Sequence, residues 1–100
     1  MLEKKGEELM TETEVNEQIH KFVLESLAWR EGIMDFAEGD SLLDNGVITS
    51  LGIYRLVTFF EENFRIHVPD DDLVPHNFRT ITDMGRYVRE RMAVAGRPAG

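Results

Sequence analysis

An apolar stripe between residues 50 and 64 constrains the fold of this chain more than any other feature. Apolar side chains recur there at the spacing of one helix face, at Ile53, Leu56, Val57, Phe60 and Phe64. Such a stripe is typical of an α-helix that turns one face toward a core. The segment just before it, residues 44–46, reads Asp-Asn-Gly, which indicates a turn because Asn and Gly tolerate positive φ. We therefore predict a helix from about residue 50 to residue 64 that directly follows a turn.

Two further helices are predicted on either side of this stripe. Thr11 and Glu14 have the spacing of a capping box, and apolar residues then recur at helical spacing to about Arg30. Thr80 and Asp83 have a similar spacing and begin a last helix. Its predicted buried side consists of Ile81, Met84, Val88 and Met92, with Tyr87 beside it. Gly85 inside this helix costs up to ~1 kcal/mol relative to alanine, which indicates close helix packing at that point.

Residues 31–49 show neither a helix nor a strand pattern and are predicted to form a long loop. Loops of this length are usually functional or are held by their own apolar residues. The candidates here are Ile33, Met34, Phe36, Leu42, Leu43, Val47 and Ile48. Between the second and last helices, Asp70 is expected to cap a single helical turn that Pro75 ends.

The predicted fold class is therefore all-α, a small bundle of three main helices with a long first loop and a short helical turn. The chain has 100 residues, enough for one domain. We predict that this domain spans residues 11–92, between a flexible lead-in (1–10) and a flexible tail (93–100).

Composition and charge exclude several classes of function. The absence of cysteine excludes disulfides, a thiolate nucleophile and cysteine metal sites. The net charge of −8 argues against nucleic acid as a partner and favours a partner with a basic surface. No apolar run approaches the ~20 residues of a membrane span, and the N-terminus is too charged for a signal peptide. We expect a cytoplasmic, monomeric protein.

No catalytic or metal-binding pattern is found. His20, His67 and His76 are not spaced as metal ligands or as a nucleophile and its base. A calcium loop around Gly46 fails because Leu43 would have to act as a ligand. The acidic run 70–72 is better interpreted as negative charge at the start of a helical turn. The chain is therefore not expected to be an enzyme, and no metal site is predicted.

Two serines remain as candidate sites, Ser41 and Ser50. Ser50 opens the amphipathic helix after a turn, and a helix N-terminus favours an attached phosphate. Ser41 lies in the middle of the loop, with no element to hold it. Ser50 could instead cap the helix, as serines often do. The residues alone leave both roles of Ser50 open.

Several segments share their order and spacing with one known family. They are Asp-Ser-Leu-Leu-Asp-Asn-Gly-Val-Ile-Thr-Ser-Leu (40–51), Phe-Glu-Glu-Asn-Phe (60–64), Ile-His-Val-Pro (66–69) and Asn-Phe-Arg-Thr-Ile (77–81). Together they cover most of the chain between Val15 and Met92 and resemble the acyl carrier protein family. The resemblance places the attachment site at Ser50 and not at Ser41.

The resemblance implies that Ser50 carries a phosphopantetheine arm, which a phosphopantetheinyl transferase takes from coenzyme A with the help of Mg²⁺. The thiol of the arm would then hold an acyl or aminoacyl group as a thioester. The implied partners are this transferase, a loading ligase, and downstream synthase or transferase enzymes. They would recognise the residues beside the arm, Thr49, Leu51, Arg55, Thr58 and Glu62. The region of Leu42, Leu56 and Phe60 would line a cavity for an acyl chain or simply fill the core.

Two residues depart from the family pattern. Thr49 stands where the family usually has an aspartate that helps the transferase and its metal, and Arg55 stands where fatty-acid carriers are usually acidic. These departures favour a specialised stand-alone carrier of a biosynthetic pathway over the housekeeping fatty-acid carrier. Thr49 also motivates an alternative, an interaction module with the carrier fold that never receives the arm. A hydrolase that uses Ser50 is a third possibility, but it lacks a recognisable base.

Overall fold

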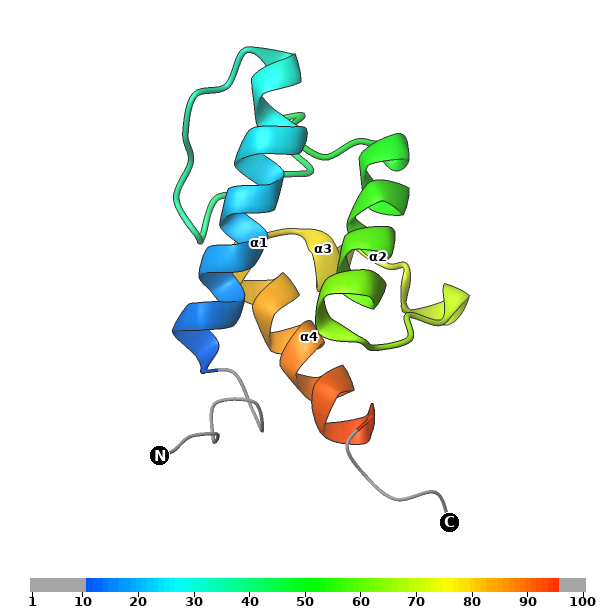
Figure 1. Cartoon of the computed structure of the whole chain (residues 1–100). Helices are drawn as coiled ribbons and strands as arrows, with labels where there is room; N and C mark the ends of the chain where they lie inside the picture. Colours follow the sequence, from blue (N-terminus) through cyan, green and yellow to red (C-terminus); the bar gives the residue numbers. More distant parts are fainter. Residues whose placement is uncertain (1–10, 96–100) are drawn as a thin grey trace.

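The computed structural model describes residues 11–95, which form four α-helices, two 3₁₀ turns and no strand (Figure 1). The helices are α1 (Glu12–Ser26), α2 (Ser50–Phe64), α3 (Pro75–Phe78) and α4 (Ile81–Ala95), and the 3₁₀ turns are η2 (Ala28–Glu31) and η3 (Asp70–Asp72). The predicted all-α class and the three main helices are confirmed. Helix α4 continues past the predicted domain end at residue 92. The predicted lead-in (1–10) and residues 96–100 of the tail lie outside the described residues.

The first helix begins as predicted but ends earlier. The Thr11 amide donates to Glu14 Oε1 at 2.9 Å, and the Glu14 amide donates to Thr11 Oγ1 at 3.1 Å, which completes the capping box. The α-helix stops at Ser26, and the chain continues through η2 to Gly32, whose φ is +76°. A 3₁₀ turn has ~3.0 residues per turn, so the apolar register changes there. Trp29, which lies in this 3₁₀ turn, is 60% exposed.

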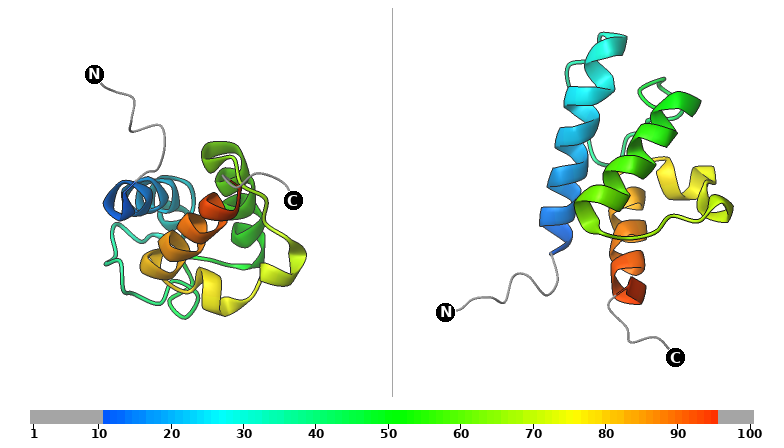
Figure 2. Two further views of the ribbon diagram at one scale, coloured as in Figure 1. Left: turned by 90° about the horizontal axis from the view of Figure 1, so that it is seen from below. Right: turned by 45° about the vertical axis from the view of Figure 1, so that its right-hand side comes forward.

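The three long helices enclose one core. Helix α1 packs along α4, and α2 stands beside them (Figures 1 and 2). Leu56, Phe60 and Phe64 of the stripe are buried, and Ile53 and Val57 are half-buried against the core. The ring of Phe60 stacks on that of Phe78 in α3 with their centroids 6.0 Å apart. The fully buried side chains of this core include Val15, Ile19, Val23, Leu42, Leu56, Phe60, Phe78, Ile81, Met84 and Val88.

The long loop between η2 and α2 is held by its own apolar residues, as predicted, with one exception. Its side chains at Phe36, Leu42, Val47 and Ile48 are buried, and those at Ile33 and Leu43 are half-buried. Met34 is 84% exposed, so its predicted role in holding the loop is wrong. Its neighbour Ile33 faces inward, and successive side chains of an extended segment point to opposite sides.

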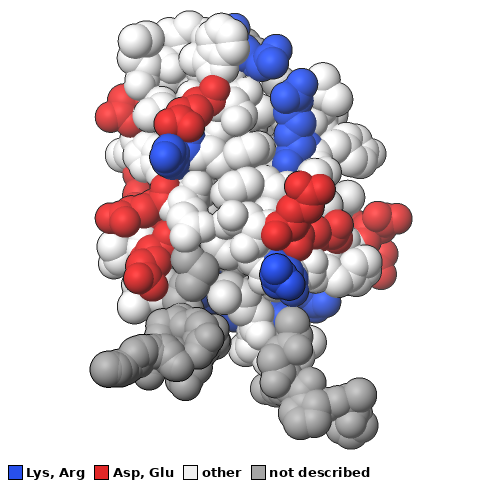
Figure 3. Space-filling model, viewed as in Figure 1, with Lys and Arg blue, Asp and Glu red and all other residues white. Residues whose placement is uncertain are grey.

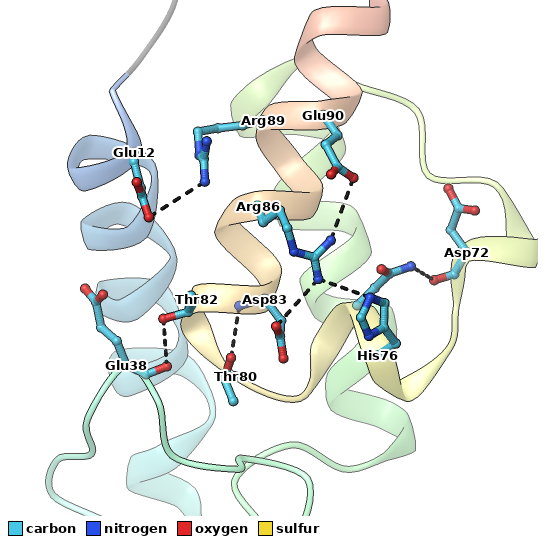
Figure 4. Close-up of polar contacts among 11 residues, drawn as sticks. Glu12, Glu38, Asp72, His76, Thr80, Thr82, Asp83, Arg86, Arg89 and Glu90 are labelled. Atoms are coloured by element: carbon cyan, nitrogen blue, oxygen red, sulfur yellow. Dashed lines mark hydrogen bonds and ion pairs between the residues drawn. The ribbon is translucent and has the colours of Figure 1, made fainter.

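Hydrogen bonds attach this loop to the start of α4. The Leu42 amide donates to the Arg79 carbonyl oxygen at 2.7 Å, and the Thr82 amide donates to the Glu38 carbonyl oxygen at 3.2 Å. The Thr82 hydroxyl also points toward the Glu38 carbonyl oxygen (Figure 4). The Asp83 amide donates to Thr80 Oγ1 at 2.9 Å, which confirms the predicted cap of the last helix. The loop therefore has a defined path that leads to the N-terminus of α2.

The ion pairs that α4 forms with other described residues lie at the surface. Arg86 lies between Asp83 and Glu90, at 3.5 and 3.8 Å, and Arg89 lies 3.8 Å from Glu12 of α1 (Figure 4). Exposed ion pairs of this kind contribute about 0–1 kcal/mol each. The close packing of α1 and α4 therefore depends mainly on their buried apolar side chains.

The connection between α2 and α4 contains two helical pieces, where one was predicted. Arg65, with φ of +57°, ends α2 in the left-handed conformation. Asp70 lies inside η3, whose start has no side-chain cap, so its predicted capping role is wrong. Pro75 begins α3 instead of only ending the preceding turn. Proline suits the first position of a helix because its φ is already helical and its missing N–H is not needed there.

A partly buried hydrogen bond joins η3 to α4 and predicts a stability difference. Tyr87, which is 4% exposed, donates its hydroxyl to Asp72 Oδ2 at 2.6 Å. Burial, followed by this hydrogen bond, raises the pKa of the Tyr87 phenol above its ordinary value of 10.0. We expect Tyr87→Phe to lower the free energy of unfolding at neutral pH by about 1–2 kcal/mol, because Asp72 loses its donor.

The same bond makes stability depend on pH on the alkaline side. Tyr87 of the unfolded chain releases its proton near pH 10, while the folded chain retains it, so stability falls as the pH rises above about 10. Urea unfolding of both proteins between about pH 8 and pH 11 checks this, with the difference between them shrinking as pH rises. Equal stabilities at about pH 8, or a difference that is constant across this range, would contradict the assignment.

Candidate functional site

Thr49, and not Ser50, caps helix α2. Thr49 is extended (φ −111°, ψ 178°), and its Oγ1 accepts a hydrogen bond from the Gly52 amide at 3.3 Å. Its carbonyl oxygen accepts from the Ile53 amide at 3.0 Å. Threonine is a good N-cap residue for the same reason as serine, a short side chain with an acceptor oxygen. The capping role that the sequence left open for Ser50 is therefore filled by its neighbour.

The residues before Thr49 hold this helix start in place. Gly46 has φ of +83°, as a tight turn requires, and Asn45 Oδ1 accepts from the Val47 amide at 3.1 Å. Val47 and Ile48 are only 2% and 3% exposed, and the Ile48 amide donates to the Leu42 carbonyl oxygen at 3.0 Å. The two buried side chains and the two hydrogen bonds anchor the chain one residue before the cap.

Ser50 and Ser41 lie in different surroundings. Ser50 is exposed at the first position of α2. The first N–H groups of a helix have no intrahelical partner, and the helix dipole favours negative charge there. Ser41 is half-buried, and its Oγ accepts from the Asp44 amide at 3.3 Å, so it takes part in the local turn. Of the two serines, Ser50 combines an exposed hydroxyl with a helix N-terminus.

The other predicted recognition residues share one exposed face of α2. Leu51, Arg55, Thr58 and Glu62 are all exposed and lie about one turn apart, and Leu51 is 66% exposed. Thr49 is exposed at the start of the same helix. On the side of the molecule shown in Figure 3, a band of uncharged side chains lies between the charged ones. Leu42, Leu56 and Phe60, in contrast, are fully buried, which favours their role as core.

A hollow of about 250 Å³ lies at the start of α2, where both chain neighbours of Ser50 line it but Ser50 itself does not. Its lining residues come from the junction of α1 and η2, from η2, the loop and α2, and they are Leu27, Arg30, Val47, Thr49, Leu51, Gly52 and Arg55. Arg55 also lines a second hollow of about 380 Å³ between α1 and α2, together with Tyr54. Arg30 lies with its guanidinium carbon 5.5 Å from the centroid of the Trp29 ring. These contacts define what we call the Ser50 face, made up of Trp29, Arg30, Leu51, Tyr54 and Arg55.

Three of these residues were missed as site residues from the sequence. The sequence patterns gave no site role to Trp29 and Tyr54, which are 60% and 64% exposed. Arg30 was expected only to end the first helix. A break of the helical register before Gly32 is the one sequence signal that could have indicated that Trp29 and Arg30 turn outward.

Each of the three histidines contacts a different partner. His20 Nε2 is 3.2 Å from Asp35 Oδ1, and its ring stacks on Phe36 at 4.5 Å. The Phe36 amide, and then His20, lower the pKa of the Asp35 carboxyl from its ordinary value. His67 pairs with Glu61, and His76 lies near Arg86. No histidine lines the hollow beside Ser50, and no group of three metal-ligating side chains occurs within residues 11–95.

Comparisons with models of known protein families and with curated protein sequences found no match. Within the described part of the chain, every helix is too short or too polar to cross a membrane.

Proposed function

We propose that this protein carries acyl or aminoacyl groups on a phosphopantetheine arm attached to Ser50. The observation that supports this most is the division of roles at the start of α2. Thr49 caps the helix, which leaves the exposed hydroxyl of Ser50 free of any structural task. The resemblance of residues 40–51 to the acyl carrier protein family points to the same atom.

The residues around Ser50 fit the proposed arm. Its phosphodiester is an anion, and both the N-terminus of α2 and the guanidinium groups of Arg30 and Arg55 favour an anion in this region. The apolar part of the adjoining hollow, which includes Leu51, suits the uncharged remainder of the arm. The thiol at the end of the arm supplies the thioester chemistry that the chain, which has no cysteine, cannot provide itself.

The loading step needs a separate enzyme. In this step Ser50 Oγ bonds to the phosphorus of the phosphopantetheine unit, the pyrophosphate bond of coenzyme A breaks, and adenosine 3′,5′-bisphosphate leaves. The hydroxyl proton passes to a base of the transferase, since no histidine lines the hollow at Ser50. We propose that a loading ligase and downstream synthase or transferase enzymes then act on the arm. In this proposal the protein is a substrate and carrier and not an enzyme.

The experiment that tests the proposal is an intact-mass measurement. The full chain is co-expressed with a broad-specificity phosphopantetheinyl transferase, in parallel with Ser50→Ala and Ser41→Ala variants. We expect a phosphopantetheine-sized increment in the wild-type chain and in Ser41→Ala, and none in Ser50→Ala. An unmodified wild-type chain, or an increment that survives Ser50→Ala, would show that the proposal is wrong.

The second candidate is a module with this fold that binds partners and is never modified. Thr49 motivates it, because the aspartate usual in the acyl carrier family is absent. In that case Ser50→Ala leaves the biological activity intact. Loss of activity in Ser50→Ala, with folding unchanged by circular dichroism and partner binding retained, would count against this candidate.

A further inference from the structure

We propose that the Ser50 face binds a partner protein whose docking surface is apolar and bears carboxylates opposite Arg30 and Arg55. This deepens the proposed function and rests on it, because an enzyme that acts on an arm at Ser50 has to contact the side chains around that residue. The proposal specifies the chemistry of the partner's surface. The net charge of −8 would instead suggest a partner with a basic surface.

The charge of the Ser50 face differs in sign from that of the whole chain. Among the side chains of residues 11–30 and 32–94, neither Arg30 nor Arg55 has an ion-pair partner. The residues that line the hollow beside Ser50 include both arginines and no acid. The residues three and four positions from Arg55 along α2, within reach of its side chain, are Leu51, Gly52, Thr58 and Phe59. Two guanidinium groups at a hollow that no acid lines are suited to carboxylates of another molecule.

The same face exposes large apolar side chains. Trp29, Leu51 and Tyr54 are 60%, 66% and 64% exposed. Trp, Tyr and Arg are the residue types that contribute most of the binding energy at protein interfaces. The contact of Arg30 with the Trp29 ring also keeps this guanidinium at the face, at a centroid distance of 5.5 Å. A partner surface that combines apolar area with carboxylates therefore complements both kinds of side chain.

Glu62 marks the end of this positive region. It lies seven positions after Arg55, which corresponds to about 10 Å along the helix. Interactions between exposed charges are largely screened beyond about 8 Å at physiological ionic strength. A carboxylate of the partner that lies opposite Arg55 is therefore attracted by the two arginines more strongly than it is repelled by Glu62 or by acids farther away. Local charges, more than the net charge, decide which surface docks here.

Two synthetic helical peptides test the proposal with the full chain. They share one leucine face and carry either glutamate or lysine at all other positions. Trp29 is the only tryptophan of the chain, so its fluorescence reports binding at this face, and amide shifts in two-dimensional NMR spectra locate it. At about 0.15 M salt we expect the glutamate peptide to bind at least about tenfold more tightly than the lysine peptide. The shifts should cluster at Leu51, Tyr54 and Arg55.

Charge reversal provides the matched controls. The double variant Arg30→Glu, Arg55→Glu should bind the lysine peptide more tightly than the glutamate peptide. The variant Arg79→Glu changes an exposed arginine that does not line the hollow, and it should keep the preference of the wild type. Circular dichroism verifies that each variant is folded. Equal binding of the peptides, preference for the lysine peptide, or shifts centred on residues 70–72 would overturn the proposal.

Two related measurements test whether the Ser50 face binds a membrane or a second copy of this chain instead. If vesicles of phosphatidylcholine and phosphatidylserine change the Trp29 fluorescence and the glutamate peptide does not, the face binds membranes. If sedimentation shows self-association that Arg30→Glu, Arg55→Glu abolishes, it binds a second copy. Either result overturns the proposal.

Binding of the peptides does not require an arm on Ser50. The experiments can therefore refute the docking proposal and the carrier function independently of each other. An unmodified wild-type chain that prefers the glutamate peptide refutes only the carrier function. A modified chain without this preference refutes only the docking proposal.

Discussion

Gly85→Ala is expected to lower the free energy of unfolding by about 1–3 kcal/mol, although alanine is the better helix former. Gly85 is buried in α4 where this helix meets α1. A Cβ atom at this position would lie 1.7 Å from Oδ1 and 2.9 Å from Cγ of Asn16. One of the two helices, or the Asn16 side chain, has to move to make room.

Asn16 cannot move aside without cost. It is 4% exposed, and its Nδ2 donates to Glu38 Oε1 at 3.4 Å. Its Oδ1 has no hydrogen-bond partner among the described residues, so only the Nδ2 end of this buried amide group is hydrogen-bonded. Displacing it would strain the contact between α1 and α4 or break its bond to the loop.

A double-mutant cycle separates this collision from a general effect of the substitution. We expect the variant Asn16→Ala, Gly85→Ala to regain most of the lost stability, because the obstructing side chain is gone and alanine favours the helix. Urea unfolding followed by circular dichroism gives the four stabilities. The explanation is wrong if Gly85→Ala is as stable as the wild type, or if removing Asn16 does not improve it.

Thr49→Asp is expected to accelerate the loading of Ser50 by about tenfold, which corresponds to about 1.4 kcal/mol in the barrier. Under the proposed function, the resemblance implies that an aspartate here assists the transferase and its Mg²⁺. Aspartate caps a helix as well as threonine does, so the structural role of Thr49 is retained. The measurement is the initial rate of conversion of the unmodified chain, followed by intact mass at a fixed transferase concentration.

Thr49→Asn is the matched control for this experiment. Asparagine also caps the helix but lacks the charge, so its loading rate should remain close to that of the wild type. Thr49→Ala removes the cap and should cost about 1 kcal/mol of stability, which identifies any effect of a frayed helix on loading. Equal loading rates for the aspartate and asparagine variants would mean that a negative charge at position 49 does not accelerate the transferase reaction.

The long helices could be predicted because their signals are local. The capping box at Thr11 and the apolar stripe that ends at Phe64 depend on residues three or four positions apart, which meet in any α-helix. Gly85 was linked to close packing for a similar reason, since a glycine inside a helix needs a compensating contact. Its partner, Asn16, could not be named, because nothing local connects two residues so far apart in the chain.

The short elements were predicted less well. Pro75 was expected only to end a turn, yet it also begins α3, because proline fits both positions and the packing of Phe78 against Phe60 favours the helix. The bond between Tyr87 and Asp72 likewise joins segments that only the folded chain brings together.

The sequence by itself determined the all-α class, the three main helices and the start of α2 at about Ser50, because each depends on local spacing. The tertiary structure decided that Thr49 and not Ser50 is the cap. Both residue types cap well, and the buried Val47 and Ile48 set which of them stands at that position. It also brought Arg30 of η2 and Arg55 of α2 to one hollow. Packing between distant segments determines which exposed side chains become neighbours, and this information is absent from the local pattern of either helix.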